Sequence, residues 1–194
     1  MIYLVRHGET AFNRERRLQG HVDSELTELG VRQAQAVARL LADLTRGEPG
    51  WRVISSPLAR ARRTAEFVAQ AVGAEVEEDR RLIELSWGEW DGRLRRELEA
   101  AYPEAFGRSG WAFDAPTGET YEQVCARMAD WLASLPPEPE RRVIAVSHGV
   151  AGRVLRGVYA DLGRDRTVDQ DVPQDAVYRL QDGRIGRIDC EPLG

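Results

Sequence analysis

Residues 2–9, IYLVRHGE, join a short apolar run directly to four polar or glycine residues. Two further segments have the same form, WRVISS (51–56) and RRVIAVSHG (141–149), and a helical pattern follows each of the three. Short β-branched runs that alternate with helical periodicity are typical of parallel βα units. The sequence therefore predicts an α/β fold built on a mostly parallel sheet, and the stretch 176–188 predicts a hairpin around Asp182-Gly183.

Capping residues predict where several helices begin and end. Thr27 is placed as the N-cap of a helix over 28–44, and Thr120 begins a capping box before the next long apolar stripe. Ser56-Pro57 has the form of an N-cap followed by the first helical position, and Gly73 is a typical stop. These signals place helices between and after the three apolar strands.

A chain of 194 residues with 42% apolar residues fits one domain, which we expect to span residues 1–194. Residues 93–118, here called the excursion, are irregular and rich in glycine and proline, so we expect them to cover one end of the sheet. No apolar run approaches the ~18 residues of a membrane span, and no signal peptide is evident at the N-terminus. We therefore predict a cytoplasmic protein without membrane partners.

Charge and cysteine content exclude several classes of function. The net charge of −5 argues against general nucleic-acid binding, which needs a basic surface. The two cysteines lack the spacing of metal ligands, so we predict neither a zinc site nor a disulfide scaffold. All 27 basic residues are arginines, and the absence of lysine rules out a Walker A phosphate loop and a Schiff base.

Polar residues follow each of the three predicted strands at the point where the strand ends. Because ligands of doubly wound sheets bind beyond the carboxyl ends of parallel strands, these residues should meet in one region. Helix N-termini in the same region favour anions, and glycine lets the backbone approach a ligand closely. The sequence thus predicts an anion site, for phosphate, formed by Arg6, His7, Gly8, Arg60, His148 and Gly149.

Four stretches resemble the signatures of the histidine phosphatase superfamily, the phosphoglycerate mutase-like clan. They are LVRHGETAFN (4–13), SSPLARARRTA (55–65), RLIELSWGEWDG (81–92) and VSHG (146–149), and they occur in the family's order within roughly residues 1–160. The resemblance implies a three-layer α/β/α sandwich with helices on both faces of the sheet. It also implies phosphoryl transfer without a metal or another cofactor.

The resemblance implies a role for each matching residue. His7 would be the nucleophile that becomes a phosphohistidine, with its tautomer fixed by a hydrogen bond to backbone near Gly8. Glu84 would carry the proton to and from the leaving oxygen. The phosphoryl oxygens would be held by Arg6, Asn13, Arg60 and His148, and His148 is most useful there as the cation. The pocket would be lined by Thr10, Gln19, Gly20 and Gly149, whereas His21 is expected to be an exposed loop residue.

Three functions are compatible with these residues. The first is a hydrolase of small phosphomonoesters, and it is favoured because the excursion lacks the lysine that mutases of this family carry. The second is a phosphoglycerate mutase, for which the arginines of the excursion would supply the missing charge. The third is a non-catalytic phosphate-binding module.

For the assembly of the chain, a homodimer is the prediction to test. The aromatic residues Trp87, Trp90, Phe106, Trp111 and Phe113 could form either a wall for an organic leaving group or the core of the excursion.

Overall fold

The computed structural model describes residues 1–192, and six strands among them form one sheet. The strands are short because each apolar run is bounded by polar residues or glycine. Their bounds are β1 Ile2–Arg6, β2 Arg52–Ser55, β3 Val76–Glu78, β4 Val143–Ser147, β5 Ala176–Gln181 and β6 Arg184–Asp189.

The sheet has the order β3-β2-β4-β1-β5-β6. Strands β3, β2, β4 and β1 are parallel to one another, whereas β5 is antiparallel to β1 and to β6. The antiparallel pair is the predicted hairpin, turned at Asp182-Gly183, where both residues have positive φ. The prediction of a mostly parallel sheet is therefore confirmed.

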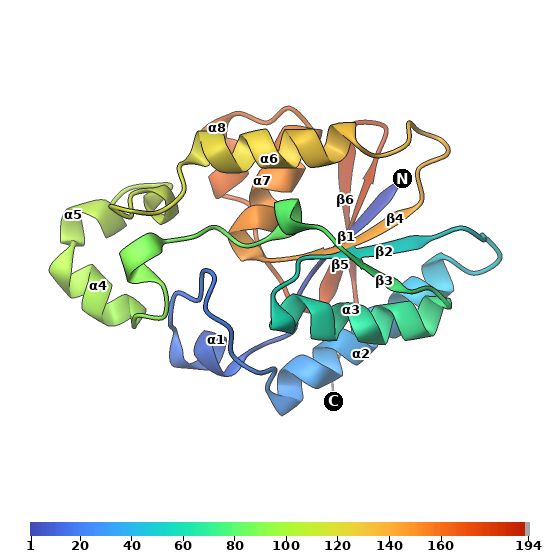
Figure 1. Ribbon diagram of the computed structural model, residues 1–194, viewed down its shortest axis with the longest axis horizontal. Coiled ribbons are helices and arrows are strands. Elements are labelled where there is room, and N and C mark those ends of the chain that lie inside the picture. The colour runs from blue at the N-terminus through green and yellow to red at the C-terminus, as the bar shows by residue number, and fades with distance from the viewer. Residues whose placement is uncertain (193–194) are drawn as a thin grey trace.

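Long helices cover both faces of the sheet (Figure 1). Helices α2 (Glu28–Leu44) and α3 (Ala59–Val72) lie on one face, and α6 (Tyr121–Ala133) and α7 (Gly149–Tyr159) lie on the other. Each face has its own core because successive side chains of a strand point to opposite sides. Tyr3 and Val5 of β1 pack with α2 and α3, whereas Ile2 and Leu4 pack with α6 and α7. The three-layer sandwich is confirmed.

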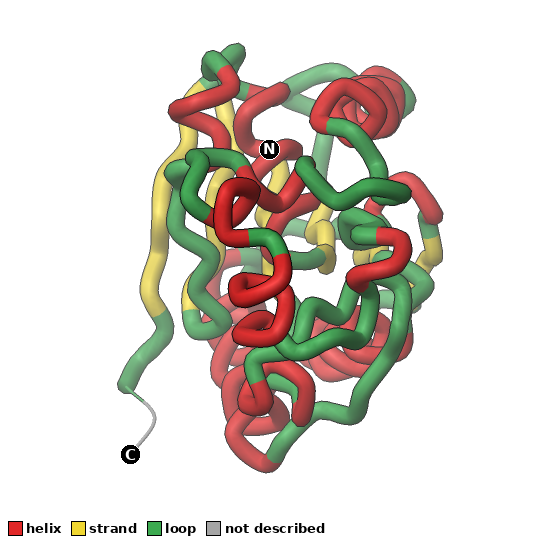
Figure 2. The backbone as a smooth tube through the Cα atoms, turned by 90° about the vertical axis from the view of Figure 1, so that its left-hand side faces the viewer, coloured by secondary structure: helices red, strands yellow, loops and turns green. Residues whose placement is uncertain are grey.

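Shorter elements gather at the end of the sheet that holds the excursion (Figure 2). They are α1 (Ala11–Glu15), α4 (Arg95–Ala101), α5 (Pro103–Phe106) and α8 (Arg164–Val168), together with 3-10 turns at Arg80–Leu82, Gly88–Trp90 and Trp111–Phe113. The ring of Phe106 stacks on Trp90 at 5.4 Å and on Trp111 at 4.5 Å between centroids. This aromatic stack is the core of the excursion, one of the two roles that the sequence left open.

Most of the predicted caps are present. Thr27 and Thr120 accept backbone N–H groups at the starts of α2 and α6, and Gly73 ends α3 in the left-handed conformation. The prediction for Ser56-Pro57 is wrong, because α3 begins at Ala59 and has Leu58 as its N-cap. The hydroxyl of Ser56 lies 2.7 Å from Nε2 of His148.

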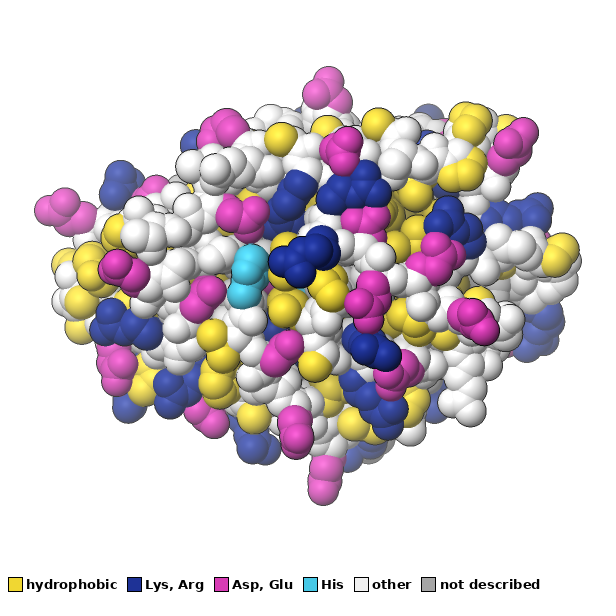
Figure 3. Space-filling model, in the orientation of Figure 1, with side chains coloured by type: hydrophobic (Ala, Val, Ile, Leu, Met, Phe, Trp, Pro, Cys, Tyr) yellow, Lys and Arg dark blue, Asp and Glu magenta, His cyan; other side chains and the backbone are white. Residues whose placement is uncertain are grey.

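Within residues 1–192, no helix is both long and apolar enough to cross a membrane. Acidic and basic side chains are intermixed over the face shown in Figure 3.

Candidate active site

His7 follows β1 directly and is 2% exposed. Its Nδ1–H donates to the carbonyl oxygen of Gly8 at 2.8 Å, so the lone pair of the neutral ring is on Nε2. Burial, followed by the charges of Arg60 and Arg6, holds the pKa of His7 well below its usual range. The residue therefore presents an unprotonated nitrogen at neutral pH, as a nucleophile requires.

His148 lies at the start of α7, with its ring centroid 5.1 Å from that of His7. Its Nε2 lies 2.7 Å from the hydroxyl of Ser56, which also accepts the N–H of Leu58 at 3.3 Å. Burial and the nearby charge of Arg60 hold the pKa of His148 well below its usual range. The protein alone thus favours a neutral His148, contrary to the expected cation, and only an anionic ligand would reverse that preference.

Arg60 extends from the first turn of α3 and is 2% exposed. Its Nη1 donates to the carbonyl of Val22 at 3.0 Å and to the carboxylate of Asp23 at 2.7 Å, and its Nη2 donates to the carbonyl of Gly20 at 2.7 Å. The loop after α1 therefore fixes the plane of this guanidinium.

Arg6 is held in a similar way, by a hydrogen bond from Nη1 to the carbonyl of Val172 at 2.5 Å. Burial lowers its pKa to about 10, although Glu84 favours the charged form, so Arg6 remains a cation at neutral pH. The Nε atoms of Arg6 and Arg60 and Nδ1 of His148 are buried without a hydrogen-bond partner in residues 1–192. Buried polar groups normally have partners, and the two unpaired arginine N–H groups suit an anion.

Glu84 follows the 3-10 turn Arg80–Leu82 and is 6% exposed. Its carboxylate lies at the N-terminus of α7, where Oε1 accepts the N–H of Ala151 at 2.9 Å and Oε2 that of Val150 at 3.3 Å. A Cβ at Gly149 would lie 3.6 Å from Nε of Arg6 and 3.7 Å from Oε2 of Glu84. The acid and the arginine therefore share one narrow space beside Gly149.

The side chains expected to line the pocket are engaged with the protein itself. Thr10 is fully buried and caps α1 by accepting the N–H of Asn13. The amide oxygen of Asn13 accepts from Gln174 at 3.1 Å, and that of Gln19 accepts from Ser24 at 3.1 Å. The side-chain nitrogen of Asn13 is available to another partner, whereas the hydroxyl of Thr10 is used to cap α1.

Two glycines are required by close packing. A Cβ at Gly8 would lie 2.2 Å from the carbonyl oxygen of Gly30, so Gly8 lets the end of β1 approach α2, and its close approach to a ligand stays a prediction. Gly20 has φ +51°, and a Cβ there would lie 1.7 Å from a carboxylate oxygen of Asp91. Gly20 therefore lets the loop after α1 pack closely against Asp91, which lies in the segment that follows Glu84.

The family model of the histidine phosphatase superfamily, branch 1, matches residues 2–184. This chain belongs to the histidine phosphatase superfamily. Among relatives, it is 38% identical over 192 residues to a probable phosphoglycerate mutase GpmB of Erwinia tasmaniensis, with 97% of this chain and 84% of that protein covered. It is 41% identical over 160 residues to the protein of that name from Cronobacter sakazakii, covering 77% and 70%.

Solved structures of similar proteins have the same architecture. A mycobacterial glucosyl-3-phosphoglycerate phosphatase in complex with VO3 matches with a TM-score of 0.78 at 28% identity, covering 98% of this chain and 99% of that one. Bacillus stearothermophilus YhfR matches with a TM-score of 0.80 at 27% identity, covering 97% and 95%.

The histidine phosphatase motifs meet in this chain as the strand ends predicted, around His7, Arg6, Arg60, Glu84 and His148. Several supporting residues were missed, because their partners are remote in the chain. They are Asp23 and Ser56, which contact Arg60 and His148, Gln174, which donates to the carbonyl of His7 at 3.1 Å, and Arg127, which holds the segment at Glu84. His21 is exposed, as expected, yet its Nε2–H donates to the carbonyl of Glu84 at 2.9 Å.

Proposed function

We propose that this protein is a phosphomonoester hydrolase that acts through a phosphohistidine at His7. The observation that carries the proposal is the hydrogen bond from Nδ1–H of His7 to Gly8, which leaves the Nε2 lone pair free among the buried donors of Arg6 and Arg60. A neutral imidazole in that position attacks phosphorus and gives a labile N–P bond.

The first step transfers the phosphoryl group from the substrate oxygen to Nε2 of His7. Arg6, Arg60 and His148 would hold the phosphoryl oxygens, on which the transition-state charge is spread. The P–O bond breaks as Glu84 gives a proton to the leaving oxygen, so a neutral alcohol departs. In the second step Glu84 takes a proton from water, the oxygen of that water bonds to phosphorus, and His7 leaves neutral with inorganic phosphate as product.

A phosphoglycerate mutase is the second candidate, because the curated relatives are named probable mutases. Arginines of the excursion would then have to bind a second acidic group of the substrate. Arg95 instead pairs with Glu99 at 2.7 Å and lies over the ring of Trp111, and Arg108 lies 3.5 Å from Asp114. These pairings favour the hydrolase, as does the name of the mycobacterial phosphatase of similar structure.

The test measures phosphate release from a panel of phosphomonoesters by wild type, His7→Ala and the surface control Arg166→Gln. We expect turnover by wild type and the control, none by His7→Ala, and a rate ~10²–10³ lower for Arg60→Ala because one charge-stabilising clamp is lost. A chelator should leave the wild-type rate unchanged.

The same panel includes 3-phosphoglycerate with 2,3-bisphosphoglycerate. Interconversion of phosphoglycerates that far exceeds phosphate release would show a mutase and contradict the hydrolase. Activity that survives in His7→Ala would contradict the phosphohistidine mechanism.

A further inference from the structure

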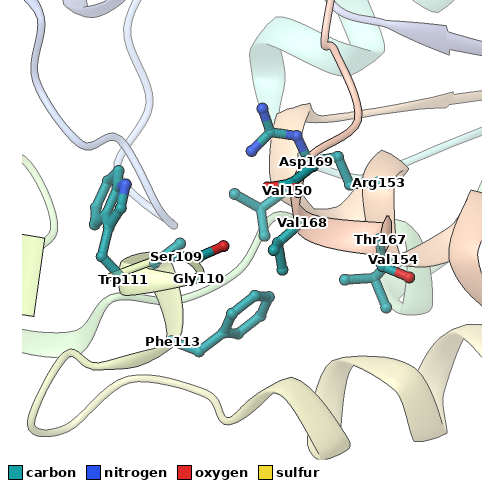
Figure 4. Close-up of a pocket in the computed structure, with 11 residues that line it drawn as sticks. Ser109, Gly110, Trp111, Phe113, Val150, Arg153, Val154, Thr167, Val168 and Asp169 are labelled. Carbon is teal, nitrogen blue, oxygen red and sulfur yellow. The ribbon is translucent and has the colours of Figure 1, made fainter. Parts of the chain in front are cut away.

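A cavity of about 340 Å³ lies between the excursion and the face of the sandwich that α7 covers. It is lined by residues 109–113, the first two turns of α7, and the end of α8. In Figure 4, Phe113 extends from the excursion toward Val168 and Val150 on the opposite wall. This volume is in the range of small-molecule sites, which span ~300–1,000 Å³ and combine apolar walls with a few polar groups.

The cavity lies beside the proposed proton carrier. Val150 lines it and also donates its backbone N–H to Oε2 of Glu84. The leaving oxygen must be within hydrogen-bond reach of Glu84 and roughly in line with His7 across phosphorus. The alcohol part of the substrate, which is attached to that oxygen, therefore extends toward this cavity.

Arg153 is a fixed cation in the wall of the cavity. Its Nε donates to the carbonyl of Gln170 at 2.5 Å, and the amide of Gln170 donates back to the carbonyl of Arg153 at 3.0 Å. Among the described residues, no carboxylate lies within 4.0 Å of its guanidinium nitrogens. Asp169 also lines the cavity but is solvent-exposed.

Arg153 is close enough to the reaction centre to affect its charges. Burial and Arg156 lower the pKa of Arg153, whereas the carboxylates of Glu84, Asp169 and Asp171 raise it. Arg153 in turn lowers the pKa of Arg6. A ligand group that reaches Arg153 can thus be part of a molecule whose phosphate is held at Arg6.

We propose that this cavity receives the leaving group and that Arg153 selects phosphomonoesters whose alcohol part carries a second anionic group. The proposal rests on the proposed hydrolase function. Phe113 and Val150 would pack against the carbon skeleton, and the free guanidinium N–H groups of Arg153 would bind carboxylate or phosphonate oxygens. Arg153 would therefore be a specificity-determining residue, without a part in the transfer of the phosphoryl group.

The test uses matched substrates: phenyl phosphate, 4-carboxyphenyl phosphate and 4-phosphonophenyl phosphate. They differ in the second anion and share the aromatic skeleton. We expect wild type to prefer, in kcat/KM, the two substrates that carry a second anion, and Arg153→Gln to lower this preference about tenfold, as the loss of a charge-assisted hydrogen bond implies. The carboxylate and phosphonate arms show which anion Arg153 prefers.

Two further variants separate selection from structural damage. Val168→Glu adds a negative charge to the cavity wall while Arg153 stays in place. It should lower the preference for substrates that carry a second anion. Arg166→Gln is the control. Arg166 is an exposed residue of α8, the helix that holds Val168, and it does not line the cavity, so this substitution should leave the preference unchanged. If Arg153→Gln lowers kcat/KM for all three substrates by one common factor, the proposal is overturned.

A binding measurement keeps this test independent of turnover. Calorimetric titration with benzylphosphonate and 4-carboxybenzylphosphonate compares ligands without and with a second anionic group, and the P–C bond of both is not hydrolysed. We expect wild type to bind the carboxylated ligand more tightly and Arg153→Gln to lose that difference. Equal affinities in wild type would contradict the cavity proposal, whereas absence of phosphate release with this binding preference intact would contradict only the hydrolase.

Discussion

At the scale of single residues, the site depends on burying ionisable groups next to one another. His7 and His148 are each 2% exposed, and burial, followed by the charges of nearby arginines, holds the pKa of each well below its usual range. The same burial leaves Nε of Arg6, Nε of Arg60 and Nδ1 of His148 without partners within residues 1–192. Such an arrangement lowers the stability of the folded protein and favours the binding of an oxyanion.

Two buried neutral histidines predict that stability falls in acid. Between the pKa of an unfolded histidine, near 6.5, and the lower folded pKa, the unfolded chain binds protons that the native protein does not. The free energy of unfolding therefore rises with pH in that window, with a slope for each histidine that approaches about 1.4 kcal/mol per pH unit well below pH 6.5. Because the unfolded histidine is only half protonated at pH 6.5, urea unfolding from pH 6.5 to 5.5 should show a loss of stability about 1 kcal/mol smaller in His148→Gln than in wild type.

Equal slopes in the two proteins would show that His148 binds protons to the same extent in the native and the unfolded state, and would contradict the lowered pKa. A matched His21→Gln variant, at an exposed histidine, controls for the loss of a histidine as such.

At the scale of elements, a helix remote from the motifs positions the proton carrier. Arg127 of α6 donates from Nη1 to the carbonyls of Arg81 and Ile83, at 2.7 and 2.8 Å, and from Nη2 to that of Glu84 at 3.3 Å. It also pairs with Glu119 at 3.0 Å. The segment before Glu84 is irregular, so these bonds replace the backbone partners that a strand or helix would give.

Arg127→Gln should therefore misplace Glu84 and weaken proton transfer. We expect kcat to fall about tenfold for alkyl phosphates, whose leaving oxygen needs a proton, and less for 4-nitrophenyl phosphate, whose leaving group is stable as the anion. Steady-state kinetics on both substrates measures this difference. Arg62→Gln, an exposed arginine of α3 that pairs with Glu66, is the control.

An equal loss on the two substrates would indicate that Arg127 acts on folding alone.

At the scale of the whole molecule, the sandwich and the excursion are held by different forces. The sheet carries two apolar cores, and Trp131 and Leu41 are among the large side chains buried in them. The excursion rests on the stack of Trp90, Phe106 and Trp111, together with the contact of Phe113 with Tyr121. Phe106 and Trp111 are only partly buried, so the excursion should open at a lower free energy than the sandwich.

Phe106→Ala should loosen the excursion and leave the sandwich folded. We expect faster limited proteolysis within residues 95–115 and a small loss of global stability, because the ring is partly exposed and its neighbours can relax. Mass spectrometry of the fragments and a thermal melt measure the two effects. Phe67→Ala, another partly buried phenylalanine on α3, should leave the cleavage rate in the excursion unchanged. If cleavage of Phe106→Ala is spread evenly over the chain, the excursion does not open at a lower free energy than the sandwich, and the prediction is contradicted.

The sequence by itself determined the α/β alternation with a mostly parallel sheet and the end of the sheet that holds the site. Both are local consequences of periodicity, since alternating strands and helices admit few arrangements and the carboxyl ends of parallel strands meet at one edge. Resemblance to the family's motifs then implied the three layers, added Glu84 and gave roles to His7, Arg60 and His148. These predictions needed no knowledge of which side chains touch.

Tertiary structure alone decided how those residues are held. Ser56 has a sequence typical of a helix cap, but its hydroxyl lies against His148, 92 positions away in the chain. Gly8 is required by the backbone of Gly30, and Arg127 reaches Glu84 from another helix. Hydrogen bonds and burial of this kind depend on distances between remote segments, and they set the charge state of His148. The periodicity of a sequence carries no record of them.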